Sequence, residues 1–146
     1  NQINNELEFV INSYKPITKI KICLKSNSNL AAINLIEKSP KKAKFLEGTI
    51  KELKLNVSVT NRDVFKLQNK FKDDVFVVRA FKPLEIILEL IHNKAENWKK
   101  FFIFLGKTGK HELLQASKIW DIEYKQRVSV TSNDSTVIEI NRLIKK

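Results

Sequence analysis

The sequence is short of the residue types that several classes of protein require. It has a single cysteine, Cys23, so an intramolecular disulfide or a cysteine-based metal site is excluded, and we expect this residue to be a small buried hydrophobe in a strand. It has no run of 18 or more uncharged apolar residues and no secretion-signal pattern. We therefore expect a cytoplasmic protein without a membrane span or a metal site.

Methionine and glycine are also scarce. The chain begins at Asn1 and contains no methionine, so we expect a fragment, a processed form or a truncated reading frame. It has three glycines, none of them in residues 1–30. The Gly-x-Gly-x-x-Gly of dinucleotide-binding dehydrogenases is therefore absent, and residues 106–109 (Gly-Lys-Thr-Gly) lack the full spacing of a nucleotide phosphate-binding loop. These absences count against a dehydrogenase and an NTPase.

Basic residues, in contrast, are abundant. Lysine and arginine number 27 against 16 acidic residues, which gives a formal net charge of +11. Such an excess favours polyanionic partners through phosphate contacts and counterion release, so nucleic acid is the leading partner. The alternative is an AT-rich genome that encodes many lysines, because Asn and Ile are also abundant. The length of 146 residues and the apolar share of 42% fit one compact domain.

Apolar periodicity from residue 31 onward alternates between strand-like and helix-like, which is typical of an α/β chain with a mostly parallel sheet. The continuous apolar run at 75–78 fits a central strand that is covered on both faces. The predicted strands span residues 32–36, 57–60, 75–78 and 101–105. Residues 31–146 should pack as one body, with helices on both faces of the sheet.

Amphipathic stripes predict the helices between these strands. The first helix has Ser39 as its N-cap and Pro40 at its first position, and the second begins after Pro83. A third helix is predicted at 110–120, with Leu113, Ala116 and Trp120 on one face.

The two ends of the chain differ in how well they can be placed. The carboxyl end predicts an antiparallel hairpin, with strands at 123–131 and 136–140 joined by the turn 132–135. Residues 1–30 form a separate lead-in, which holds an amphipathic stretch near residues 7–11 and a candidate strand at 20–24.

Ligands of open α/β sheets bind outside the carboxyl ends of the strands, so the residues that end strands are the candidate site. Glu37 ends the strand 32–36, where a carboxylate can accept hydrogen bonds from both hydroxyls of a ribose; the alternative is a solvated acid paired with a lysine. After the strand 57–60, an adenine ring could lie against Val64 and donate its amino group to Asp63, with an ordinary loop as the alternative.

Arg79 closes the central strand. An arginine in this position is costly unless it is paired or solvated in a cleft, so it more often marks a site than a plain surface. His92 and His111 fall on different predicted helices, and we expect both on the surface. No residue is predicted to act as a general acid, a general base, a nucleophile or a metal ligand.

Four segments in combination resemble the bacterial small-subunit ribosomal RNA methyltransferase G family (RsmG, also called glucose-inhibited division protein B). These segments are Leu35-Ile36-Glu37-Lys38-Ser39, Lys42-x-x-Phe45-Leu46, Val78-Arg79-Ala80-Phe81 and Leu105-Gly106-Lys107. Their order and spacing match throughout residues 31–146. The resemblance implies a Rossmann-like class I methyltransferase sheet with an antiparallel last strand, truncated at its amino end, and S-adenosylmethionine as cofactor.

The resemblance also implies an activity and a set of roles. The activity is methyl transfer from S-adenosylmethionine to guanine N7 of 16S rRNA, free or in an assembling small ribosomal subunit, by a monomer. By resemblance, Glu37 holds the ribose, Asp63 and Val64 lie on the adenine side, and Arg79 lies at the cofactor and substrate mouth. The candidate RNA phosphate contacts are Lys38, Lys41, Lys42 and Lys107.

The sequence departs from the family pattern at two places. The family's first strand ends in a loop of the form Gly-Ser-Gly-Ala-Gly-Phe-Pro-Gly, whose glycines let the backbone approach the methionine part of the cofactor, and residues 1–30 have no glycine. Leu105 stands where the family usually has a lysine, and Lys107 is the nearest substitute. The alternative function is therefore a noncatalytic RNA-binding remnant of the same fold.

Overall fold

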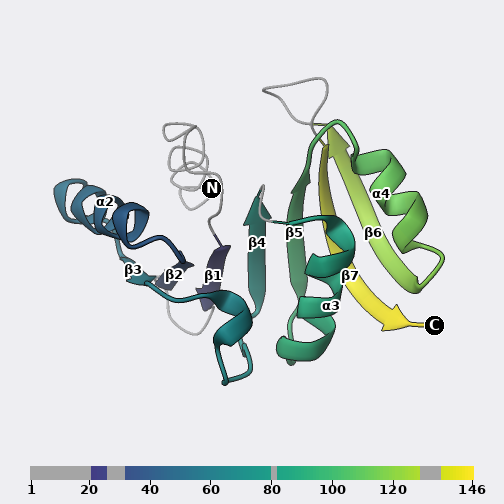
Figure 1. Cartoon of the computed structure of the whole chain (residues 1–146), viewed down its shortest axis with the longest axis horizontal. Helices are drawn as coiled ribbons and strands as arrows, with labels where there is room; N and C mark the ends of the chain where they lie inside the picture. The colour runs from purple at the N-terminus through teal and green to yellow at the C-terminus, as the bar shows by residue number, and fades with distance from the viewer. Residues whose placement is uncertain (1–20, 26–31, 80–81, 129–135) are drawn as a thin grey trace.

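The computed structural model describes residues 21–25, 32–79, 82–128 and 136–146, and within these ranges it forms a seven-stranded sheet with flanking helices (Figure 1). The elements along the chain are β1 (Lys21–Lys25), β2 (Ala32–Ile36), α2 (Pro40–Glu52), β3 (Val57–Thr60), the 3-10 helix η1 (Val64–Lys66), β4 (Val75–Arg79), α3 (Leu84–Lys94), β5 (Lys100–Leu105), α4 (Gly109–Ala116), β6 (Trp120–Val128) and β7 (Thr136–Lys145). The spatial order of the strands is β3-β2-β1-β4-β5-β7-β6.

Five of the seven strands share one direction. β2 runs parallel to β3 and β4 runs parallel to β5, whereas β1 is antiparallel to both β2 and β4. β7 is antiparallel to β5 and to β6, so β1 and β7 are the two reversed strands. The predicted α/β fold with a mostly parallel sheet and an antiparallel hairpin at the carboxyl end is confirmed. The reversed direction of β1 was not predicted.

The core forms two layers, one on each face of the sheet, because neighbouring residues of a strand point to opposite faces. Ile36 lies in the larger layer, together with buried residues of β4, β5, α3 and α4. Leu35, next to it in sequence, packs on the other face against Leu46 of α2 and Val77 of β4. The prediction of helices on both faces is thereby confirmed.

Helix α2 begins as its sequence predicts. Ser39 is the N-cap, its hydroxyl accepts a hydrogen bond from the Lys42 backbone N–H at 3.4 Å, and Pro40 occupies the first helical position. This pairing satisfies one of the backbone donors that a helix leaves unpaired at its amino end.

The predicted helix at 110–120 is wrong at its carboxyl end. Helix α4 ends at Ala116, and Trp120 is the first residue of β6. Trp120 is 1% exposed and its ring lies 5.2 Å from that of His92, so it reaches the same core as Leu113 and Ala116 from a strand. The spacing of Leu113, Ala116 and Trp120 in the sequence is the same whether Trp120 continues the helix or begins a strand, so spacing alone could not distinguish the two.

The hairpin also differs from its prediction. β6 begins at Trp120, three residues before the expected start, and β7 continues past Ile140 to Lys145. Trp120 pairs with Lys145, so both strands extend as far as the buried tryptophan. The predicted turn at 132–135, the strand end at 129–131 and most of the lead-in 1–30 lie outside the described residues. Within that lead-in, the predicted strand agrees with β1, which includes Cys23.

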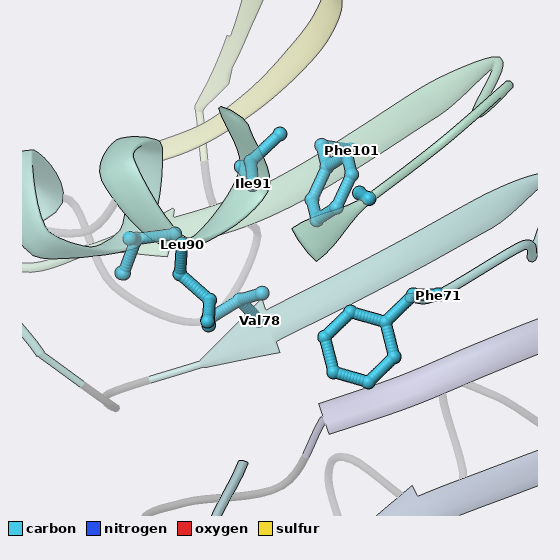
Figure 2. A pocket seen from close by; sticks show the side chains of 7 residues that line it. Phe71, Val78, Leu90, Ile91 and Phe101 are labelled. Carbon is cyan, nitrogen blue, oxygen red and sulfur yellow. The ribbon is translucent and has the colours of Figure 1, made fainter. Parts of the chain in front are cut away.

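A small cavity lies between α3 and the sheet (Figure 2). Leu90 and Ile91 of α3 line it together with Val78, Phe101 and Phe71, all through apolar side chains. Its volume is about 10 Å³, the space of roughly one water-sized sphere, so it is a packing defect and not a cofactor pocket.

Two glycines offer a matched test of this packing. A Cβ added to Gly109 would lie 2.6 Å from the Leu105 Cβ, so we expect Gly109→Ala to lower the free energy of unfolding by about 1–3 kcal/mol. Gly48 lies inside α2 with nothing within 4 Å of an added Cβ, and Gly48→Ala should raise it by about 0.5–1 kcal/mol. Urea denaturation measures both changes, and two changes of the same sign would contradict the packing described here.

Candidate functional site

The carboxyl ends of β2 and β4 flank the central strand at one edge of the sheet. Lys21, the first residue of β1, pairs with Ile36 on one side and with Val78 on the other. Glu37 follows Ile36 directly and Arg79 follows Val78, so both predicted site residues lie at this edge, one strand apart. The structure thus brings together the two strand ends that the sequence singled out.

Glu37 is a buried carboxylate with one oxygen in use. The residue is 2% exposed, and its Oε1 accepts a hydrogen bond from the Ser39 backbone N–H at 2.7 Å. Its Oε2 is buried and has no hydrogen-bond partner among the described residues. Leaving a buried acceptor unpaired costs about 1–3 kcal/mol, and more when the group is charged, so this oxygen is a candidate for a ligand hydrogen bond. A ribose hydroxyl is a donor of the required kind.

The backbone around Glu37 is held by the neighbouring strand. The Glu37 N–H donates to the Thr60 carbonyl at 3.1 Å, which continues the parallel pairing beyond the end of β2. The Asn61 amide donates to the carbonyls of Glu37 and Lys38, at 2.8 and 3.1 Å. Asn61 was not predicted as a site residue, although its position directly after the predicted strand 57–60 was a usable signal.

Asp63 is tied to the same turn through Lys38. Its Oδ1 accepts from the Phe65 N–H at 3.1 Å, and its Oδ2 lies 3.0 Å from the Lys38 ammonium. The hydrogen bond from Lys38, followed by that from Phe65, lowers the pKa of Asp63 below its ordinary value. Both oxygens of Asp63 thus have protein partners, so an adenine amino group would have to be an additional donor.

Val64 and Arg79 have different surroundings. Val64 is 5% exposed and belongs to the larger core layer, which leaves little of its surface for an adenine ring. Arg79 is half-buried, and its guanidinium carbon lies 5.9 Å from the centre of the Phe104 ring on β5, within the range of a cation–π contact. The adenine role of Val64 and the mouth role of Arg79 stay predictions. Ala80 and Phe81, which follow Arg79, lie outside the described residues.

The four candidate RNA-contacting lysines fall on two connections at this edge. Lys38 is the second residue after β2, and Lys41 and Lys42 are in the first turn of α2. Lys107 lies between β5 and α4. Lys38, Lys41 and Lys107 are exposed and Lys42 is partly exposed.

Two features are absent from the described part of the chain. There, no group of three or more histidine, cysteine, aspartate or glutamate residues could hold a metal ion. In those same ranges, no helix is both long enough and apolar enough to cross a membrane.

Comparison with known proteins gives one family. The family model described as rRNA small subunit methyltransferase G matches residues 19–141. The ribosomal RNA small subunit methyltransferase G of Pelagibacter ubique is 36% identical over 127 residues, which are 87% of this chain and 59% of the relative. The corresponding protein of Rickettsia felis is 28% identical over 120 residues, which are 82% of this chain and 61% of the relative. The chain thus spans about 60% of the length of these relatives.

A solved structure agrees on the fold. The crystal structure of M. jannaschii TYW2 in complex with AdoMet superposes with a TM-score of 0.51 at 16% identity, and the match covers 77% of this chain and 57% of that chain. This likeness supports the class I methyltransferase fold and nothing finer.

The Lys38–Asp63 pair predicts a pH effect. The pKa of Asp63 is lower in the folded state than in the unfolded state. The Lys38–Asp63 pair therefore stabilises the folded protein above the unfolded pKa of about 3.9, and this stabilisation is lost as the pH falls through the pKa of Asp63 in the folded state. Lys38→Met should raise the pKa of Asp63 and make the protein less stable at neutral pH, by a small amount because Lys38 is exposed. This loss should vanish at low pH.

An NMR titration of the Asp63 carboxyl carbon, combined with urea denaturation at several pH values, measures both effects. Lys44→Met, which changes an exposed lysine of α2, is the control and should leave the titration of Asp63 in place. If the Asp63 curve were the same in Lys38→Met as in the unaltered protein, Lys38 would not be the cause of the lowered pKa.

Proposed function

Because the chain belongs to the rRNA small subunit methyltransferase G family, we propose that it binds S-adenosylmethionine and directs methyl transfer to guanine N7 of 16S ribosomal RNA. The observation that carries the proposal is the buried, unpaired Oε2 of Glu37 at the carboxyl edge of the sheet. In open α/β sheets this edge is where nucleotide cofactors bind, and an acid at the end of a strand is the group that binds their ribose.

The surroundings of Glu37 suit a ribose diol. The Ser39 N–H holds Oε1 and so limits the rotation of the carboxylate, while Asn61 fixes the backbone that carries it. Because Oε2 has no donor among the described residues, a ribose hydroxyl that reached it would not have to displace a protein donor. A prepared acceptor of this kind avoids part of the ordering cost of binding.

The chemistry asks little of the chain beyond binding and orientation. When bound, S-adenosylmethionine supplies a methyl group on a cationic sulfonium. Guanine N7 already has a lone pair in the plane of the base, so no side chain has to remove a proton before the transfer. We assign Arg79 to the mouth, where its guanidinium beside Phe104 can orient the incoming nucleotide.

The lysines at the start of α2 support an RNA partner. Cations in the first turn of a helix are unfavourable for its macrodipole, and the first turn of α2 has Lys41 and Lys42 and no acid. A phosphate at this place would be attracted by both ammonium groups and by the amino end of the helix. Lys107 would provide a further phosphate contact on the connection that follows β5.

A second function, RNA binding without catalysis, is favoured by β1. This strand runs opposite to β2 and β4, so its last residue, Lys25, pairs with Ala32 at the edge away from Glu37. The carboxyl end of β1 therefore lies at the edge opposite Glu37. A loop that follows β1 there is on the wrong side to contact the methionine part of a cofactor bound at Glu37. The ribose side fits the proposed cofactor, whereas the described residues offer no glycine-rich backbone for its other end.

Calorimetry with S-adenosylmethionine distinguishes these two functions. Three versions of the protein are compared: the chain as it is, a graft in which the family's glycine-rich strand replaces residues 21–30, and the same graft with Glu37→Ala. We expect the graft to bind most tightly. Loss of Glu37 removes hydrogen bonds to a charged group that contribute roughly 1.5–3 kcal/mol, so the graft's affinity should fall about tenfold to hundredfold.

Glu47→Ala in the graft is the matched control, because Glu47 is an exposed acid on α2. This control should bind as the graft does. If the graft binds no better than the original chain, or if Glu37→Ala leaves its affinity unchanged, the cofactor assignment fails and the noncatalytic function becomes the better proposal.

RNA affinity provides the second test. Binding to a 16S rRNA fragment should weaken steeply as salt is raised, and Lys41→Glu with Lys42→Glu should weaken it for every RNA sequence. The slope of log affinity against log salt should fall by about one for each phosphate contact that is lost. Lys51→Glu with Lys54→Glu makes the same change of charge in the last turn of α2 and two residues beyond its end, and it should have little effect on RNA affinity. A slope near zero in the unaltered protein would remove the electrostatic argument for RNA.

A further inference from the structure

Glu112, in the first turn of α4, binds the starts of two helices. Its Oε2 accepts a hydrogen bond from the backbone N–H of Leu84, the first residue of α3, at 2.7 Å. Its Oε1 accepts from the hydroxyl of Thr108, the N-cap residue of α4, at 2.6 Å. A single carboxylate therefore joins two segments that are 24 or more residues apart in sequence.

Helix α3 depends on this contact because it has no side-chain cap of its own. Its N-cap residue is Pro83, which makes no capping hydrogen bond, and Leu84 is fully buried. The first backbone N–H groups of a helix have no partner within the helix, and a carboxylate is favoured there by the helix macrodipole. Glu112 supplies the missing acceptor from the neighbouring helix.

The two helices begin at the site edge described above. α3 follows β4, which ends at Arg79, and α4 follows β5 through the loop that carries Lys107. The base of that loop is fixed by the backbone, because the Gly109 N–H donates to the Gly106 carbonyl at 2.9 Å. Thr108 is fixed by its bond to Glu112. Glu112 is thus a direct link between the loop after β5 and the start of α3.

Both carboxylate oxygens of Glu112 accept hydrogen bonds from donors within the protein, the Leu84 N–H and the Thr108 hydroxyl. Three exposed lysines lie on the segments that Glu112 joins, Lys82 before α3, Lys107 in the loop and Lys110 in α4, beside one exposed acid, Glu85. An acid among these lysines opposes the attraction of phosphate, so a role in contacting RNA directly does not explain it. A role in placing the loop does.

We propose that Glu112 is a positioning residue that couples the loop after β5 to the start of α3, and thereby places Lys107 for contact with RNA beside Arg79. This inference rests on the proposed function, because it assumes that RNA binds at this edge. It adds to that function a residue that does not touch the RNA, acting through Thr108 and Leu84.

Three variants of the full chain separate the two bonds. Glu112→Ala removes both bonds, and Thr108→Val removes only the bond between residue 108 and Glu112. Glu112→Gln keeps a carbonyl acceptor for the Leu84 N–H and gains an amide donor for the Thr108 hydroxyl oxygen. Glu85→Ala, which removes an exposed acid from the first turn of α3, is the control for charge. The readouts are amide hydrogen exchange, affinity for a 16S rRNA fragment and affinity for S-adenosylmethionine.

In Glu112→Ala we expect exchange at Leu84 and Gly109 to rise about tenfold or more, and RNA affinity to fall by a similar factor. Thr108→Val should speed exchange at Gly109 without changing it at Leu84, and should weaken RNA binding. Glu112→Gln should bind RNA nearly as the unaltered protein does, and all variants should keep its affinity for S-adenosylmethionine. A purely structural role would not lower RNA affinity in Thr108→Val while leaving cofactor affinity unchanged.

The outcomes that overturn the inference differ from those that overturn the proposed function. Unchanged exchange in Glu112→Ala, or unchanged RNA affinity in both Glu112→Ala and Thr108→Val, overturns the inference while RNA binding by the unaltered protein stands. If Glu112→Gln is as impaired as Glu112→Ala, the positioning role fails also. If the unaltered protein has no measurable RNA affinity, the proposed function fails, and with it the RNA role given to Glu112.

Discussion

The candidate site depends on the pairing of β1 with two neighbours. β1 joins the pair β3-β2 to the group β4-β5-β7-β6, because no other strand in the described sheet pairs with both parts. Its register sets Ile36 and Val78 on either side of Lys21, and so places Glu37 and Arg79 at one edge. The direction of β1 then decides what else can reach that edge. An antiparallel central strand brings its first residue there, and a parallel one would bring the loop that follows it.

Two buried glutamates show how a structural acid differs from a site acid. Glu139, on β7, is 3% exposed, and its two oxygens lie 2.9 Å from the Lys100 ammonium and 3.3 Å from the Arg127 guanidinium. The hydrogen bond from Lys100 lowers the pKa of Glu139 although burial opposes this. Both oxygens of Glu139 are thus paired with cations of neighbouring strands, so neither is left to bind a ligand. Glu37 is buried to the same degree, yet its Oε2 has no partner among the described residues, and this difference supports the proposal that Glu37 binds a ligand.

The sequence predicts features that depend on residues close together in the chain. Ser39 and Pro40 predicted the start of α2. The rule that ligands bind at strand ends singled out Glu37, which lies buried directly after β2, while its binding role stays a prediction. Features that depend on distant partners could not be predicted. The direction of β1 depends on its pairing with β2 and β4, and Glu112 was missed because its partner Leu84 lies 28 residues away. The helix predicted at 110–120 extended too far for a related reason. Apolar spacing shows that Trp120 is buried but does not show whether it lies in a helix or in a strand.

If the cofactor binds as proposed, the Oε2 of Glu37, which has no described partner, links that binding to stability. In the free protein, a buried acceptor without a donor lowers stability by about 1–3 kcal/mol or more, and a ligand hydroxyl would restore this contribution. A ligand that binds only the folded state stabilises that state in proportion to the logarithm of its concentration above the dissociation constant. A ribose bound at Glu37 would therefore offset the cost of keeping its Oε2 unpaired. Because Ser39 and Asn61 hold the carboxylate in place, the free protein cannot readily avoid this cost by turning Oε2 toward solvent.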